Sequence, residues 1–248
     1  MLRRLIKVAF IMIATAVNIP LSAGNNGFFG ITTSNNISIH LKLKRLSEHD
    51  INGHKVDFIP QFENKVYDWS SPVKETCETV PCLVSSTSTE LQTKNGNSVN
   101  FTIVTQIVSD NVVIPYGNSS VLVPKDSLKF SFNISGWIFK NINNTLELGV
   151  RLSGKSYNKR FNKYGTVIYD PVGFLDNPDF AIIDGQIRFI DIDFDSSNNS
   201  SHSDIYWSLP SFNNYLYYDP VMGINSALVI QTNYLWIILT ILTILSYI

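Results

Sequence analysis

Apolar and polar side chains alternate strictly, with a period of two residues, in several segments of this sequence. The alternation runs through residues 37–44 (ISIHLKLK), 128–134 (LKFSFNI) and 146–152 (LELGVRL), and a further strand is predicted at 99–108. With this period, one set of side chains packs on a core while the other meets water, as in antiparallel sheets. Turn-forming residues separate the segments, at 52–53, 94–97, 116–118, 141–144 and 184–185. The pattern predicts an all-β, antiparallel fold.

Two stretches, 69–93 and 155–178, show no clear alternation and are predicted to be irregular connections. No segment between the two ends of the chain has apolar residues at convincing helical spacing, and no repeat or linker divides it. We therefore expect a single domain over residues 24–225, and about 200 residues is a size that β sandwiches and barrels often reach.

The N-terminal residues have the order of a secretory signal peptide. Arg3, Arg4 and Lys7 precede an apolar run, 8–17, and the small-residue site ends at Ala23. This order predicts a signal peptide at 1–23, cleaved after Ala23. The alternative is an N-terminal membrane anchor or a buried helix, but the run is too short to span a hydrocarbon core of about 30 Å.

The C-terminal residues 235–248 (LWIILTILTILSYI) are apolar, and neither Lys nor Arg follows Arg188. Small residues at 225–227 precede them, so we predict a GPI-attachment signal with Asn225 as the candidate lipidation site and 226–248 as the removed tail. The alternative is a spanning helix, since the apolar run extended back to Ala227 has about 20 residues. The absence of basic residues after the run weakens that alternative. Both readings place the domain outside the cell.

Glycosylation sequons and two cysteines agree with secretion. The Asn-x-Ser/Thr pattern occurs at Asn36, Asn100, Asn118, Asn133, Asn143, Asn198 and Asn199. Asn100 and Asn133 fall on the polar sides of their predicted strands, and Asn133 lies beside Lys129 and Ser131. Cys77 and Cys82 are predicted to form a disulfide that pins a turn; two free thiols are the alternative.

Charge and motifs exclude several functions. The formal net charge is −1 and no basic cluster is present, which argues against nucleic-acid binding. The sequence contains no Gly-x-Ser-x-Gly, HExxH, P-loop or GxGxxG motif. His202, Ser203 and Asp204 have the residue types of a catalytic triad, but adjacent residues of one strand cannot assemble its geometry. We expect no enzyme and no cofactor.

Asp191, Asp193 and Asp195 share one face of a predicted strand and are followed by Ser and Asn residues. Carboxylate and amide oxygens of this kind are ligands for a hard cation such as Ca²⁺, although the Gly and Glu positions of an EF-hand are missing. The alternative is a solvated outer face of an edge strand, where charges discourage edge-to-edge pairing.

Aromatic residues are dense at 206–218, where they fill a core or, if exposed, stack on sugars or anchor a partner.

The segments 128–139 (LKFSFNISGWIF) and 143–148 (NNTLEL) resemble the ComC supersandwich domain, the membrane-proximal domain of social-amoeba cell-surface proteins of the ComC and Tgr type. The likeness extends to 50–56 with Trp69, to 206–212 and to 218–220, and covers most of residues 24–225.

The resemblance implies an antiparallel β-supersandwich and a role in cell-surface communication or adhesion. Family members usually carry EGF-like or TIG repeats before this domain, and this sequence has none. Partner binding and site residues are therefore not carried over from the family.

We expect a non-enzymatic glycoprotein on the outer face of the plasma membrane, bound to the membrane by its C-terminal anchor, with a cell-surface protein or glycan as partner. The alternatives are a carbohydrate-binding module and a glycan-active enzyme, which would need paired carboxylates about 5–10 Å apart.

Overall fold

The computed structural model describes residues 21–32, 38–153, 158–162, 165–169, 173–195 and 202–224. All strand pairings among these residues are antiparallel, which confirms the predicted fold class at this level. The only helix in the described part of the chain is the short 3₁₀ helix η1 (Phe62–Asn64). The predicted signal peptide, apart from residues 21–23, and the predicted C-terminal tail with Asn225 lie outside the described residues. No helix in the described ranges is long and apolar enough to cross a membrane.

The seven-stranded sheet has the order β1-β2-β3-β11-β18-β17. Strand β4 also pairs with β3, along the same edge of β3 as β2. Its strands are β1 (Leu21–Gly24), β2 (Phe28–Thr32), β3 (Ser38–His49), β4 (Lys55–Phe58), β11 (Thr145–Ser153), β17 (Asp191–Asp195) and β18 (His202–Pro210). Since β1 includes Leu21–Ala23, the predicted cleavage would leave only Gly24 of this strand.

The eleven-stranded sheet has a main path β12-β13-β14-β20-β10-β19-β15-β16, and β7, β6 and β5 extend it from β10. Its strands are β5 (Val73–Cys77), β6 (Val80–Gln92), β7 (Ser98–Val108), β10 (Leu128–Ser135), β12 (Asn158–Asn162), β13 (Gly165–Tyr169), β14 (Gly173–Pro178), β15 (Phe180–Ile183), β16 (Gln186–Phe189), β19 (Tyr215–Tyr218) and β20 (Val221–Ile224). A separate hairpin consists of β8 (Val112–Tyr116) and β9 (Ser119–Val123).

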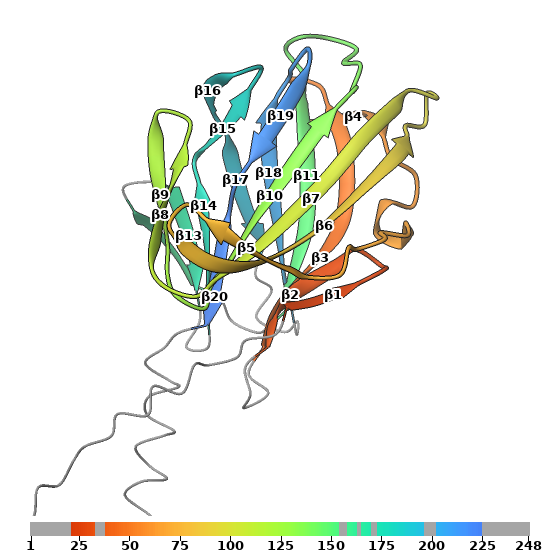
Figure 1. Ribbon diagram of the computed structural model, residues 1–248. Helices are drawn as coiled ribbons and strands as arrows, with labels where there is room; N and C mark the ends of the chain where they lie inside the picture. Colours follow the sequence, from red (N-terminus) through yellow and green to blue (C-terminus); the bar gives the residue numbers. More distant parts are fainter. Residues whose placement is uncertain are drawn as a thin grey trace, which may run out of the picture.

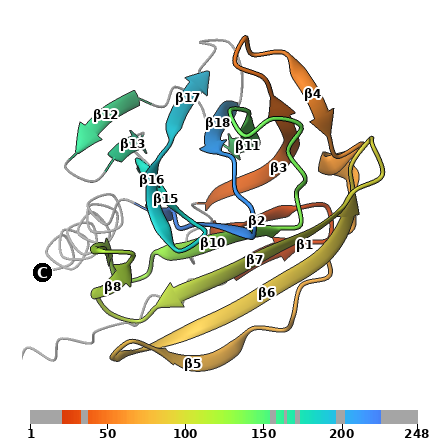
Figure 2. The ribbon, with the colours of Figure 1, turned by 90° about the horizontal axis from the view of Figure 1, so that it is seen from above.

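The two large sheets pack face to face (Figures 1 and 2). Apolar side chains of both sheets form one core, and aromatic rings meet across it: the centroids of Phe29 and Phe130 are 5.2 Å apart, and those of Phe132 and Trp207 are 5.5 Å apart. Offset or edge-to-face ring pairs at such distances add to the stabilisation by apolar burial. The predicted strands and all five predicted turns are present at their positions, because the two-residue alternation followed the side chains that enter this core.

A second core lies under the β8–β9 hairpin, on the outer side of the eleven-stranded sheet. The ring of Tyr116 stacks on Phe180 at 4.7 Å between centroids, and its hydroxyl donates to the Phe180 carbonyl at 3.0 Å. Tyr217 packs against this cluster and reaches Ser131, with 3.1 Å between the two hydroxyl oxygens. The hairpin therefore gives this part of the sheet a third layer.

Because of this third layer, the side of β10 that was predicted to face water is partly buried. Lys129 and Ser131 were predicted to face water with Asn133, and for these two residues the prediction is wrong. Lys129 is 3% exposed, and its Nζ lies 2.6 Å from Oδ1 of Asp219, which is 1% exposed. Asn133 itself is exposed. The polar side of β10 becomes buried because the hairpin, from another part of the chain, covers it.

The two stretches predicted to be irregular contain strands β5, β6, β12, β13 and β14, so that prediction is wrong. In β6, hydroxyl side chains occupy inward positions: Ser85 is 1% exposed and Thr87 is 2% exposed. Because these buried positions carry small polar residues, the sequence of β6 does not alternate between apolar and polar residues. In β13, Thr166, Val167 and Ile168 are all buried, and a strand buried on both faces shows no alternation.

Candidate functional site

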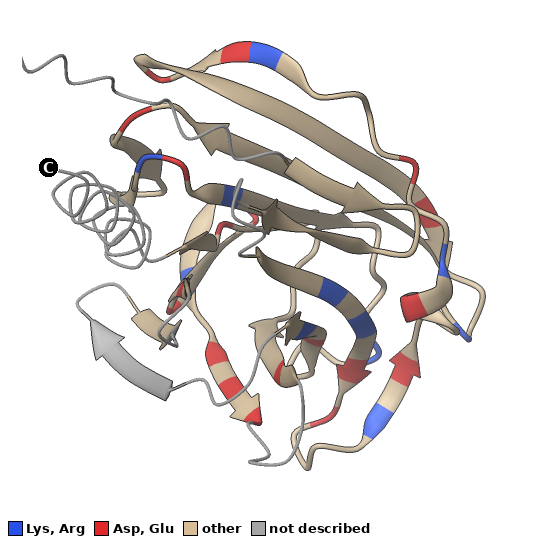
Figure 3. Ribbon diagram, turned by 90° about the horizontal axis from the view of Figure 1, so that it is seen from below, with Lys and Arg blue, Asp and Glu red and all other residues tan. Residues whose placement is uncertain are grey.

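The outward side of the seven-stranded sheet carries many charged side chains. We call it the polar face; it comprises the outward side chains of His40, Lys42, Arg45, Glu147, Arg151, Asp204, Tyr206, Asp191, Asp193 and Asp195. Basic residues gather on β3, while three acidic residues follow one another on β17 (Figure 3). The face therefore changes sign across its width.

Arg45 and Tyr206 meet across the middle of the polar face above Gly149. The sheet register puts Gly149 of β11 between these two residues. The guanidinium carbon of Arg45 is 4.1 Å from the centroid of the Tyr206 ring, and its Nε is 2.5 Å from Oε1 of Glu147. A Cβ at residue 149 would be 2.8 Å from Cγ of Arg45 and 3.1 Å from Cδ1 of Tyr206. Glycine therefore leaves the room that this cation–π contact requires.

Arg151 and Asp204 form a two-pronged ion pair on the same face. Nε and Nη2 of Arg151 donate to the two carboxylate oxygens of Asp204 at 2.7 and 2.8 Å. The hydrogen bonds and charge of Arg151 hold the pKa of Asp204 below its usual value of 3.8. Since the folded pKa is depressed, the stabilisation is present above the unfolded pKa and is lost as the pH falls through the folded one.

Asp204→Asn should therefore destabilise the protein at neutral pH and much less in acid. A partly exposed pair of this kind contributes about 1 kcal/mol or less, so we expect a melting temperature about 2–4 °C lower at pH 7. Thermal unfolding of both proteins between pH 6 and pH 2 measures the difference. A difference in melting temperature that stays constant over this pH range would contradict a stabilising ion pair between Arg151 and Asp204. Asp193→Asn, at an exposed position, is the matched control.

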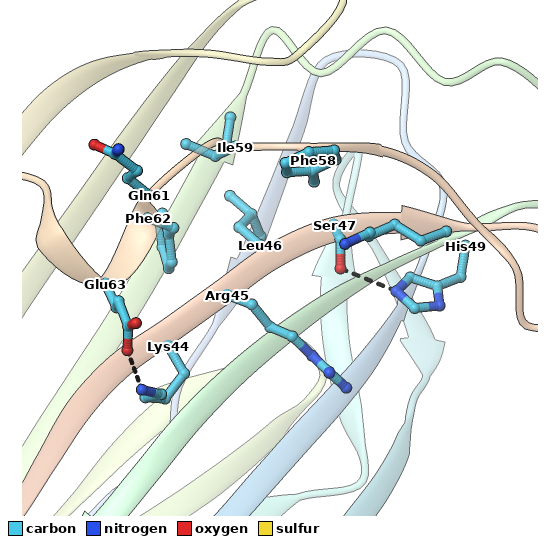
Figure 4. A pocket seen from close by; sticks show the side chains of 11 residues that line it. Lys44, Arg45, Leu46, Ser47, His49, Phe58, Ile59, Gln61, Phe62 and Glu63 are labelled. Atoms are coloured by element: carbon cyan, nitrogen blue, oxygen red, sulfur yellow. Dashed lines mark hydrogen bonds and ion pairs between the residues drawn. The ribbon is translucent and has the colours of Figure 1, made fainter.

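A hollow of about 400 Å³ opens at the edge of the polar face, where β3 has no strand neighbour on the side away from β11. β2 pairs with β3 as far as Lys42, and β4 pairs with it from Ser47 onward. Between them, η1 lies against β3. We call this hollow the edge pocket; residues 44–47, 49, 55, 58, 59 and 61–63 line it (Figure 4).

A β-bulge directs two successive cations toward the edge pocket. Gly149 pairs with Arg45 and Val150 pairs with Leu43, so Lys44 is the extra residue on β3. Bulges re-aim side chains and are frequent beside functional sites. Figure 4 shows Lys44 and Arg45 leaving β3 on the same side, with Lys44 paired to Glu63 of η1.

The edge pocket contains one more polar pair and a cation–π contact. Nε2 of His49 is 2.9 Å from the Ser47 hydroxyl. Nζ of Lys55 lies 4.4 Å from the centroid of the Phe58 ring. Among the lining residues Glu63 is the single carboxylate. This pocket therefore does not provide the pair of carboxylates that glycoside hydrolysis uses.

The predicted aspartate row lies on one face of β17, as expected from its alternation. Asp191, Asp193 and Asp195 are exposed, and Ile192 and Phe194 pack against the core. Successive members of the row are two residues apart, which is about 6.6 Å along a strand. Within the described ranges no group of three or more His, Cys, Asp or Glu side chains is placed to hold a metal ion. The row fits the alternative of a solvated edge strand, since β17 ends its sheet.

The predicted covalent sites lie as follows. Cys77 and Cys82 form a disulfide in the β5–β6 hairpin, as predicted. The sequon asparagines that fall within the described residues are all exposed: Asn100, Asn118, Asn133 and Asn143. The others, Asn36, Asn198 and Asn199, lie outside the described residues, as does Asn225. His202–Asp204 forms part of strand β18, where Asp204 is engaged by Arg151.

The aromatic run at 206–218 belongs mainly to the core. Trp207, Phe212 and Tyr218 are buried, while Tyr206 lies on the polar face and Tyr215 is 38% exposed. Sequence reasoning missed the edge pocket and the contact between Arg45 and Tyr206. One signal was available: the doublet of Lys44 and Arg45 interrupts the alternation of β3, and such an interruption is typical of a bulge.

No protein-family model and no curated protein matches this chain. The geometry of the polar face and the edge pocket, together with the sequence, is therefore the basis for a functional proposal.

Proposed function

We propose that this protein is a non-enzymatic glycoprotein displayed on the outer face of the plasma membrane, where it acts in cell–cell communication or adhesion. Its domain would be a β-supersandwich like the ComC supersandwich domain that the sequence resembles. The observation that carries the proposal is that the described sequons are exposed without exception in an all-β domain that also has a disulfide. Disulfides persist in oxidising, extracytoplasmic compartments.

The positions of the sequons favour one face for recognition. Asn100 and Asn133 lie on adjacent strands of the eleven-stranded sheet: Asn100 pairs with Ser135, and Asn133 pairs with Thr102. Glycans at both positions would cover that outer surface. The polar face of the other sheet carries none of the sequons that fall within the described residues. We therefore assign recognition of a surface protein or glycan to the polar face.

The arrangement of the chain ends agrees with attachment at the C-terminus. β1 and β20, the first and last described strands, lie at the same end of the molecule (Figure 1). An anchor after Ile224 would hold this end near the membrane. The β3–β4 and β15–β16 turns, at the other end, would then point away from it (Figure 1).

Labelling of intact cells tests the proposal. Cells that express the full chain should show it labelled by a membrane-impermeant reagent, and an amidase that removes N-glycans should lower its apparent mass. Replacing Asn100, Asn118, Asn133 and Asn143 by Gln should reduce that mass shift, whereas Asn214→Gln, at an exposed asparagine outside any sequon, should not. A protein that is protected from the reagent would show that the proposed location is wrong.

A phosphatidylinositol-specific phospholipase then distinguishes the two anchors. Release of labelled protein from intact cells is expected for a GPI anchor. Retention would show that a spanning helix holds the domain and would leave the outside location intact.

A further inference from the structure

The edge pocket has an excess of positive charge. Lys44, Arg45 and Lys55 line it against one carboxylate, that of Glu63. Lys44 is paired with Glu63, and Arg45 is paired with Glu147 outside the lining. Lys55 has no ion-pair partner within the described residues. One ammonium group is therefore available to an incoming anion.

A second lysine, Lys94, lies beside the edge pocket without belonging to its lining. Nζ of Lys94 is 5.7 Å from the centroid of the Phe58 ring, on which Lys55 also lies. The position of Lys94 is set by its backbone N–H, which donates to the Phe58 carbonyl at 2.8 Å. Lys94 also has no ion-pair partner in the described part of the chain. Lys55 and Lys94 therefore place two positive charges around one ring of the pocket lining, and both attract an anion bound beside it.

The floor and walls of the edge pocket indicate which other chemical groups a matching ligand would need. Leu46, Ile59 and Phe62 are buried and make the floor apolar, while Gln61 adds a hydrogen-bonding group. The volume of about 400 Å³ lies in the range of small-molecule sites. A matching ligand has an anionic group, hydroxyls and an apolar face on a small body. A sugar ring with an acidic substituent has this chemistry.

We propose that the edge pocket binds an acidic saccharide unit whose anionic group is held by Lys55 and attracted by the charge of Lys94 beside the pocket. The apolar side of the sugar ring rests on the apolar floor, and its hydroxyls meet Gln61. The inference deepens the proposed recognition role by naming a ligand class at the edge of the polar face. It is tested on purified protein, so its failure is distinguishable from a failure of the surface-labelling experiment.

Ligand-observed NMR of the full chain in mild detergent, with sodium glucuronate as probe, makes the test. We expect saturable binding of glucuronate, at least tenfold weaker binding of neutral glucose, and weakening of the glucuronate signal as NaCl is raised. Glucose 6-sulfate in a parallel titration distinguishes a carboxylate from a sulfate as the preferred anion. Equal binding of glucose and glucuronate, or no binding of either acidic sugar up to about 10 mM, would overturn the proposal.

Variants locate the site. Lys55→Gln should weaken glucuronate binding about tenfold, the effect of losing one charge-assisted hydrogen bond, and Lys94→Gln should weaken it less, because only charge attraction from beside the pocket is lost. Lys74→Gln, at an exposed lysine on β5, is the matched control and should leave binding unchanged. Because the side chains of Lys55, Lys74 and Lys94 are exposed, the three variants should fold alike. A loss of binding shared by all three would point to non-specific charge attraction and contradict the site.

Discussion

Lys129→Met should lower the free energy of unfolding by about 3–5 kcal/mol, the usual cost of breaking a buried ion pair from one side. The substitution would leave the Asp219 carboxylate buried without its cation, which now lies 2.6 Å away. The hydroxyl of Ser131 would remain as a donor to Asp219, but a neutral donor does not compensate a buried charge. Urea denaturation followed by tryptophan fluorescence measures the loss.

Removing the charges of both Lys129 and Asp219 should lower the free energy of unfolding less than removing that of Lys129 alone. In the double variant Lys129→Met with Asp219→Leu, no unpaired charge is buried, and replacing a buried pair by apolar residues is often close to neutral. We expect the double variant to recover at least half of the loss. If the loss of unfolding free energy in the double variant equals the sum of the losses in the two single variants, the two groups do not interact. Lys125→Met, at an exposed lysine of the same segment, should change stability by no more than about 0.5 kcal/mol.

Glu48→Leu should have the second large effect, again about 3–5 kcal/mol. The carboxylate of Glu48 is 0% exposed and accepts hydrogen bonds from Nε1 of Trp137 at 3.2 Å, from the backbone N–H of Lys140 at 2.8 Å and from the side-chain amide of Asn144. All three donors belong to the loop between β10 and β11. Trp137 and Asn144 are buried, and each buried donor left without a partner costs about 1–3 kcal/mol.

The loop should also open locally in this variant. Amide hydrogen exchange should show faster exchange at Lys140 in Glu48→Leu, and unchanged exchange in the core of β7. Glu48→Gln keeps one acceptor oxygen and should lose less stability. Glu75→Leu, at an exposed position on β5, is the control. Unchanged protection of Lys140 in Glu48→Leu would contradict the role assigned to Glu48.

The alternating sequence pattern predicted strands where the structure has them, because side-chain direction along a strand is a local property of the backbone. The same reasoning placed Asp191, Asp193 and Asp195 on one face of β17, and it placed Asn100 on an exposed one. The disulfide also followed from the local spacing of the two cysteines, together with the predicted secretion of the chain. A shared strand face alone does not bring three carboxylates to one point, so the alternation could not establish whether this row forms a metal site.

Strand β6 could not be predicted from alternation, because Ser85 and Thr87 are inward residues that look like outward ones. Thr105 donates from its hydroxyl to the Ser85 carbonyl at 2.8 Å, so polar groups in this layer find partners on the neighbouring strand. Whether a serine faces a core depends on what packs against it, and the sequence of the strand does not contain that information.

The period-two alternation by itself determined that this protein is built from antiparallel strands, and where β3, β7, β10 and β11 lie. Tertiary structure decided the rest through contacts between distant segments. The β8–β9 hairpin buries Lys129 on a strand whose pattern indicated water, and the bulge at Lys44 directs two cations to the edge pocket beside β4 and η1. The physical reason is that alternation determines on which side of a strand a residue lies. What covers that side depends on elements elsewhere in the chain.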